Sequence, residues 1–128
     1  MKLAISGSRA IDYKNADVIK LMHDEINHWI LKSKLQSREP FLVLHGGCPT
    51  GADAIADNLC KQWSIGYEVH PAEWKLNGKA AGPIRNKKIA ELCDRAVLFF
   101  KHGEPNKGTQ SMKKELDRLG KPTVTYWV

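Results

Sequence analysis

The chain has 128 residues, of which 42% are hydrophobic and 27% are charged, and its formal net charge is +6. This length and balance exclude a disordered chain and predict a single domain over residues 1–128. No apolar run approaches the roughly 20 residues of a membrane span, so no membrane partner is expected. The three cysteines show no paired spacing, which argues against a disulfide framework and favours a cytoplasmic setting. The basic charge favours an anionic partner, with a merely solvated surface as the alternative.

Short apolar runs alternate with amphipathic segments along the whole chain. Strands are expected at residues 2–6, 41–44, 66–70, 96–100 and 123–128, and helices at 14–36, 51–64, 83–93 and 109–119. Residues 71–82 are expected to form a loop. Strict alternation of strand and helix predicts an α/β fold: a Rossmann-like three-layer sandwich with a five-stranded, mostly parallel sheet and helices on both faces.

Three strand-to-helix loops combine glycine with small hydroxyl residues. They span residues 6–9, 45–53 and 103–109. Ligands of such folds bind outside the carboxyl ends of the strands, where glycine permits close approach and helix N-termini attract phosphate. The hydroxyls of Ser8, Thr50 and Thr109 can add hydrogen bonds. We therefore expect these loops to bind a phosphate-bearing nucleotide, while an ordinary tight turn is the alternative for each loop taken alone.

The common nucleotide and metal motifs are absent. The sequence contains neither G-x-G-x-x-G nor G-x-x-x-x-G-K-[ST], so it predicts neither a dehydrogenase nor an ATPase. Its histidines and cysteines show no C-x-x-C or H-x-x-x-H spacing, so no metal site is predicted, and no cofactor either. Cys60 and Cys93 fall on apolar helix faces, where buried thiols are expected.

Three further residues each allow two interpretations. Trp74, in the 71–82 loop, can stack a base, or it can plug the space beneath the loop. Arg85 is expected in the first turn of a helix, where a cation opposes the helix dipole, and this favours contact with an anion. Asp53 can accept ribose hydroxyls, but a capping box with Thr50 is the preferred interpretation.

The segments GSR (7–9), HGGCPTGAD (45–53), PAEW (71–74), AGPIRN (81–86) and KGT (107–109) resemble the YspA-like, YpsA-related branch of the SLOG superfamily. The match covers almost the whole chain. It implies a Rossmann-like protein that binds a nucleotide, an NAD- or ADP-ribose-like derivative or a signalling nucleotide, as a sensor or sequestering protein. It also implies a phage-encoded origin and a homodimer or higher homo-oligomer. The resemblance directs these residues toward the ligand: Gly7, Ser8, Arg9, Gly46, Gly47, Gly51, Asp53, Trp74, Gly82, Arg85, Asn86, Gly108 and Thr109. The loop sequences add Thr50 and Lys107.

Two alternative functions follow from the same superfamily. Its LOG phosphoribohydrolases, which cleave the N-glycosidic bond of a nucleotide, carry P-G-G-x-G-T-x-x-E, but Met112 stands at the glutamate position here. If the chain is such a hydrolase, Asp53 and Glu73 are the expected catalytic carboxylates, with Asp12 and Glu104 farther out. Single-stranded nucleic-acid binding is the second alternative. The charge and Trp74 allow it, but no run of interleaved basic and aromatic residues supports it. A small nucleotide-like molecule is thus the expected partner.

Overall fold

Five strands form one sheet in the computed structural model, which describes residues 1–128. They are β1 (Lys2–Gly7), β2 (Leu42–His45), β3 (Tyr67–Val69), β4 (Arg95–Phe100) and β5 (Thr123–Trp127). Their spatial order is β3-β2-β1-β4-β5, and every neighbouring pair is parallel. The predicted five-stranded sheet is confirmed, and it is parallel throughout.

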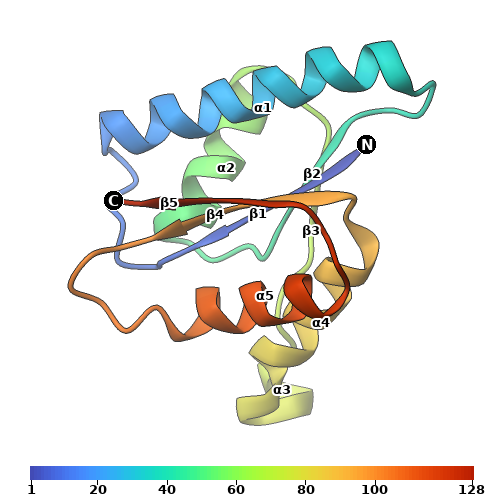
Figure 1. Ribbon diagram of the computed structural model, residues 1–128. Helices are drawn as coiled ribbons and strands as arrows, with labels where there is room; N and C mark the ends of the chain where they lie inside the picture. The colour runs from blue at the N-terminus through green and yellow to red at the C-terminus, as the bar shows by residue number, and fades with distance from the viewer.

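Helices cover both faces of this sheet (Figure 1). The helices α1 (Ala16–Gln36) and α2 (Gly51–Gln62) lie on one face, and α4 (Ala81–Leu92) and α5 (Lys107–Arg118) lie on the other. Successive strand residues alternate between the two layers. In β1, Leu3 and Ile5 join the core beneath α1 and α2, whereas Ala4 joins the core beneath α4 and α5. Strands buried on both faces explain the continuous apolar runs, and the predicted three-layer architecture is confirmed.

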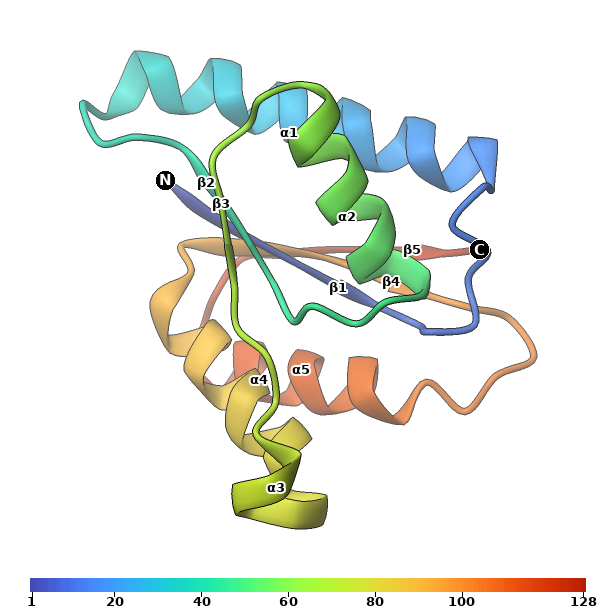
Figure 2. The same cartoon turned by 180° about the vertical axis from the view of Figure 1, so that it is seen from behind.

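The segment between β3 and α4 differs from the prediction. Within the expected 71–82 loop, α3 (Trp74–Asn77) is followed by the 3₁₀ turn η1 (Gly78–Ala80), and α4 begins two residues earlier than expected. The carbonyl of Glu73 accepts hydrogen bonds from the N–H groups of Leu76 at 3.1 Å and Asn77 at 2.9 Å. Four residues are too few to show an apolar period, so the pattern could not indicate this helix. It lies far from the sheet (Figure 2).

The order of the strands reverses beside β1. The chain proceeds from β1 outward through β2 to β3, then returns to the other side of β1 to form β4 and β5. The loops after β1 and β4 therefore diverge to opposite faces, and this switch point is where parallel sheets bind ligands. No helix of the chain is both long enough and apolar enough to span a membrane.

Candidate functional site

A pocket of about 590 Å³ opens at the carboxyl ends of β1 and β4, a size within the range of small-molecule sites. Residues from the loops after β1, β2 and β4 and from the first turns of α3, α4 and α5 form its wall. The lining residues are Ser6, Gly7, Ser8, Arg9, Ala10, Cys48, Asp53, Trp74, Gly82, Pro83, Arg85, Asn86, Glu104, Pro105, Asn106, Lys107, Gly108, Thr109 and Ser111.

Most of the residues expected at the ligand meet in this pocket, although they come from five separate stretches of the chain. They are Gly7, Ser8, Arg9, Asp53, Trp74, Gly82, Arg85, Asn86, Lys107, Gly108 and Thr109. Five other candidates do not line it: Gly46, Gly47, Thr50, Gly51 and Glu73.

Two glycines of the loop after β2 allow protein segments to pack against each other. A Cβ atom at Gly46 would overlap the Arg85 guanidinium. Gly51 has a φ of +72°, and a Cβ atom there would overlap the Ser8 carbonyl oxygen and lie 2.6 Å from the Arg9 Cα. The close approach that requires glycine at these two positions is therefore made by the protein itself.

The remaining three candidates outside the pocket are one turn residue and two N-cap residues of helices. The Gly47 N–H donates to His45 Nδ1 at 3.0 Å. Thr50 is the exposed N-cap of α2, but its side chain makes no capping hydrogen bond. Glu73 is the exposed N-cap of α3.

Asp53 does not form the expected capping box with Thr50. Its Oδ2 atom instead accepts a hydrogen bond from the Cys48 N–H at 3.2 Å, so the carboxylate folds back over the loop. The side chain belongs to the pocket lining, and the residue is only 8% exposed. Burial raises the pKa of Asp53, and the Cys48 N–H and the nearby Arg85 oppose this shift. The pocket therefore holds a desolvated carboxyl group beside a guanidinium.

Arg85 crosses from α4 to the loop after β2. Its Nη1 donates to the Gly46 carbonyl at 2.9 Å and to the His70 carbonyl at 3.4 Å, and its Nε donates to Asn86 Oδ1 at 2.9 Å. Burial lowers the pKa of Arg85, which Asp53 partly offsets, but an arginine remains charged in proteins. Its Nη2 makes no hydrogen bond within the chain, so two donors of a fixed fork remain available in the pocket.

The first turn of α5 offers further donors. Its N-cap residue Asn106 has a left-handed φ of 53°, and its side chain bonds the backbone of Lys101 rather than the helix. The N–H groups of Lys107, Gly108 and Thr109 consequently make no hydrogen bond within the chain. Thr109 is 2% exposed, and its hydroxyl also has no partner in the chain. These donors meet at the positive end of the helix dipole, which is suited to a phosphate group.

Trp74 forms part of the rim. Its ring is not a plug beneath the loop, because the residue is 51% exposed and lines the pocket. The Arg9 Cζ atom lies 5.9 Å from the ring centroid, within the range of a cation–π contact. An exposed aromatic ring and the guanidinium of an exposed arginine thus border the same opening.

Asn86 links the helices α4 and α5. It is 5% exposed, and its Nδ2 donates to the Gly108 carbonyl at 3.2 Å and to Ser111 Oγ at 3.4 Å. Its Oδ1 accepts from Arg85. The amide is therefore largely occupied within the protein, and it sets the position of the first turn of α5 relative to Arg85.

Sequence reasoning did not single out several lining residues. These are Ser6, Ala10, Cys48, Pro83, Pro105, Asn106 and Ser111. Most of them stand in the same loops as the predicted residues, so a prediction by whole loops would have included them. Ser111 is the exception, because its contribution depends on how the first turn of α5 faces α4.

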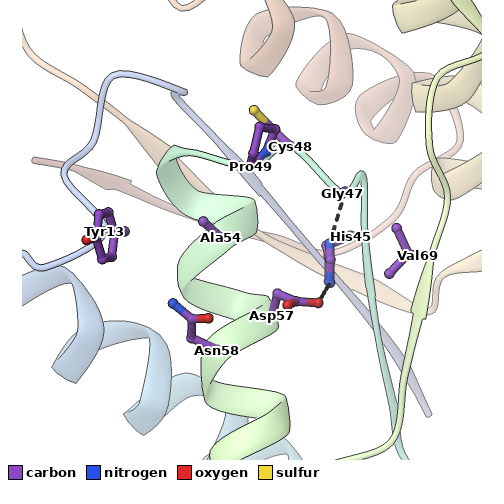
Figure 3. A pocket seen from close by; sticks show the side chains of 9 residues that line it. All are labelled: Tyr13, His45, Gly47, Cys48, Pro49, Ala54, Asp57, Asn58 and Val69. Carbon is purple, nitrogen blue, oxygen red and sulfur yellow. Dashed lines mark hydrogen bonds and ion pairs between the residues drawn. The ribbon is translucent and has the colours of Figure 1, made fainter.

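A second pocket of about 360 Å³ lies on the other side of the loop after β2 (Figure 3). Cys48 lines both pockets. No group of three or more His, Cys, Asp or Glu side chains in the chain lies close enough together to hold a metal ion. Cys60 and Cys93 are buried, as their positions on apolar helix faces predicted.

Comparisons with known proteins place the chain near a phage protein. No known protein-family profile matches it. Gene 61 protein of Mycobacterium phage D29 is 28% identical over 114 residues, which cover 84% of this chain and 90% of the phage protein. Among solved structures, the C-terminal domain of the PF1911 hydrogenase from Pyrococcus furiosus is similar with a TM-score of 0.44 and 15% identity, covering 98% of this chain and 89% of that domain. The chain is thus similar to a phage protein over most of both sequences.

Proposed function

We propose that the pocket at the ends of β1 and β4 binds a phosphate-containing nucleotide or nucleotide derivative. One observation carries this proposal: five unpaired donor groups of three kinds converge on one pocket. They are the three free N–H groups of the first turn of α5, the Thr109 hydroxyl and the Arg85 Nη2 group. A phosphate group accepts hydrogen bonds through several oxygens, and its charge complements both the helix end and the guanidinium.

The other walls of the pocket fit the remaining parts of a nucleotide. The exposed ring of Trp74 offers a face on which a base can stack, and Arg9 can cover it from the other side. The carboxyl group of Asp53 can accept hydrogen bonds from ribose hydroxyls. The resemblance to the YspA-like branch of the SLOG superfamily directs the same residues toward such a ligand. We therefore favour NAD- or ADP-ribose-like molecules and signalling nucleotides as the ligand class.

Isothermal titration calorimetry with AMP, ADP, ADP-ribose and NAD⁺ tests this proposal, with adenosine as the phosphate-free control. We expect at least one phosphorylated compound to bind more tightly than about 100 μM, which corresponds to roughly 5–6 kcal/mol. Adenosine should bind at least about tenfold more weakly. Absence of binding in the whole panel, or equal affinity for adenosine and AMP, would contradict the proposal.

A matched pair of variants tests the role of the Thr109 hydroxyl. Thr109→Val removes the hydroxyl with little change in side-chain volume, and Thr125→Val makes the same change on the exposed face of β5. We expect Thr109→Val to weaken AMP binding about fivefold, since one hydrogen bond contributes roughly 1 kcal/mol, and Thr125→Val to leave it unchanged. Equal affinities for the two variants would remove Thr109 from the phosphate site.

Binding without turnover, as in a sensor or a sequestering protein, fits the carboxylates of the pocket. Met112 is 1% exposed and belongs to the core beneath α5, so no carboxylate reaches the pocket from that position. Glu73 does not line the pocket, which leaves Asp53 and the exposed Glu104.

N-glycoside hydrolysis is the second candidate, because Asp53 combines burial with a raised pKa. A carboxyl group whose pKa is raised keeps its proton to higher pH than an ordinary aspartate and can transfer it to a leaving base. Incubation of AMP or NAD⁺ with the protein, followed by chromatography of the free base, tests this candidate. Released base that disappears in Asp53→Asn would support hydrolysis, whereas intact nucleotide after prolonged incubation would support binding alone.

A further inference from the structure

His45 lies outside the nucleotide pocket, at the end of β2, and is 1% exposed (Figure 3). Both of its ring nitrogens are used. The Gly47 N–H donates to Nδ1 at 3.0 Å, and Nε2 lies 3.2 Å from Asp57 Oδ1. A backbone N–H can only donate, so Nδ1 accepts and the ring proton lies on Nε2, which donates to Asp57. This arrangement defines one tautomer and one orientation of the ring.

Neighbouring side chains hold His45 in that orientation. The second oxygen of Asp57 pairs with Lys61 at 2.7 Å, one turn later in α2. The Tyr67 ring on β3 stacks on the imidazole with a centroid distance of 5.9 Å and an interplanar angle of 15°. The imidazole is thus fixed from α2 and β3 together, and its Nδ1 lone pair points at the turn that follows β2.

Three consecutive residues of this turn each form a hydrogen bond with a different partner. The Gly46 carbonyl accepts from Arg85 Nη1 at 2.9 Å, the Gly47 N–H donates to His45, and the Cys48 N–H donates to Asp53 Oδ2 at 3.2 Å. Gly47 has a φ of +75°, a conformation that glycine adopts as readily as a negative φ, so its own φ does not fix the turn. The bond to His45 lies between the bonds that hold the two charged groups of the pocket.

We propose that His45 is a positioning residue that holds the 46–48 turn in the conformation that aligns Arg85 and Asp53 in the pocket. This inference rests on the proposed function for its consequence on ligand affinity. Its structural part, the support of the turn by an acceptor at Nδ1, stands independently. The Nδ1 acceptor is the essential feature, and the proton on Nε2 matters because it keeps Nδ1 free to accept.

Two substitutions of His45 test the roles of its two ring nitrogens separately. In His45→Asn the amide oxygen takes the place of Nδ1 and can still accept from Gly47, whereas in His45→Gln the amide group takes the place of Nε2 and the acceptor is lost. His28→Gln, at an exposed histidine of α1, is the control. We measure amide hydrogen exchange at Gly47 by NMR, AMP affinity by calorimetry and folding by urea denaturation.

A second pair of variants avoids change to the buried ring. Asp57→Ala removes the acceptor of the Nε2 proton, so the ring can shift its proton to Nδ1 and oppose the Gly47 N–H. Asp57→Asn keeps an acceptor oxygen. The Asp57 side chain is 24% exposed, so both proteins are expected to fold.

We expect His45→Gln and Asp57→Ala to accelerate exchange at Gly47 and to weaken AMP binding, each by about tenfold or more. We expect His45→Asn, Asp57→Asn and His28→Gln to stay within about threefold of the wild type in both measurements. Protection and affinity retained in His45→Gln and Asp57→Ala would overturn the inference, as would equal loss in the paired Asn variants. A wild-type protein that binds none of AMP, ADP, ADP-ribose and NAD⁺ would refute the proposed function instead, while exchange at Gly47 would still decide the role of His45.

Discussion

Replacing Arg85 by methionine removes the guanidinium and keeps most of the apolar stem. The wild-type side chain donates to the carbonyls of Gly46 and His70 and to the Asn86 amide, two of these bonds at 2.9 Å and one at 3.4 Å. With two good bonds and one long one lost, we expect a decrease of about 1–3 kcal/mol in the free energy of unfolding. Urea denaturation measures this decrease.

The effect on ligand binding has a separate origin. The two Nη2 hydrogens of Arg85 have no acceptor in the chain and are assigned to the ligand phosphate. Loss of a charge-assisted hydrogen bond removes about 1.5–3 kcal/mol, so AMP should bind about 10–150-fold more weakly in Arg85→Met. Lys88→Met, at an exposed position of the same helix, removes the same net charge away from the pocket and should change affinity less than about twofold. If the two variants bind AMP equally well, the assignment of Arg85 to the phosphate is wrong.

Three further predictions concern stacking, packing and pH. Trp74→Ala should weaken AMP binding by about 1–3 kcal/mol with little loss of stability, whereas Trp63→Ala, at a tryptophan that is likewise about half exposed but lies outside the pocket, should leave calorimetric affinity unchanged; equal affinities would exclude stacking on Trp74. Gly51→Ala should lower the free energy of unfolding by at least about 2 kcal/mol, while Gly108→Ala, whose Cβ atom would meet open space, should change it by less than about 1 kcal/mol in urea denaturation; comparable losses would refute the packing role. Because the pKa of Asp53 is raised in the folded protein, stability should fall as pH rises above the unfolded value of 3.8, and Asp53→Asn should remove this slope; a wild type that gains stability relative to Asp53→Asn between pH 4 and pH 7 would contradict the sign.

The layered fold was predictable because strands that are buried on both faces consist of uninterrupted runs of apolar residues. Ala96 through Phe100 are buried one after another in β4, and the same run of apolar residues predicted the strand. Once the alternation of strands and helices is known, parallel pairing brings the ends of β1 and β4 together. The meeting of Arg9, Trp74, Arg85 and Lys107 in one pocket therefore follows from topology rather than from any local motif.

The roles of individual residues inside the loops depend on tertiary contacts and were less accessible. A glycine at position 46 or 51 looks the same in the sequence whether a ligand or another segment of the chain approaches it. Only the structure shows that Arg85 and Ser8 occupy the space beside these glycines. The preferred capping role of Asp53 was wrong for a similar reason, because its carboxylate accepts from the Cys48 N–H and no capping hydrogen bond forms with Thr50. Asparagine often caps the N-terminus of a helix, and Asn106 is the N-cap residue of α5. Its side chain nevertheless hydrogen-bonds the backbone of Lys101 rather than the helix.

The position of α3 has a consequence for how the pocket opens. None of its residues is buried, and it lies away from the sheet (Figure 1). The first turn of α5, by contrast, includes the buried Thr109, and the buried Asn86 holds it to α4. Elements with few buried contacts open locally at low free energy, while core elements open only with global unfolding. The segment α3, which carries Trp74, should thus open and close many times while the first turn of α5, which offers the donors for phosphate, stays in place. For the proposed ligand, we therefore expect such a site to distinguish a nucleotide from its nucleoside more sharply than one base from another.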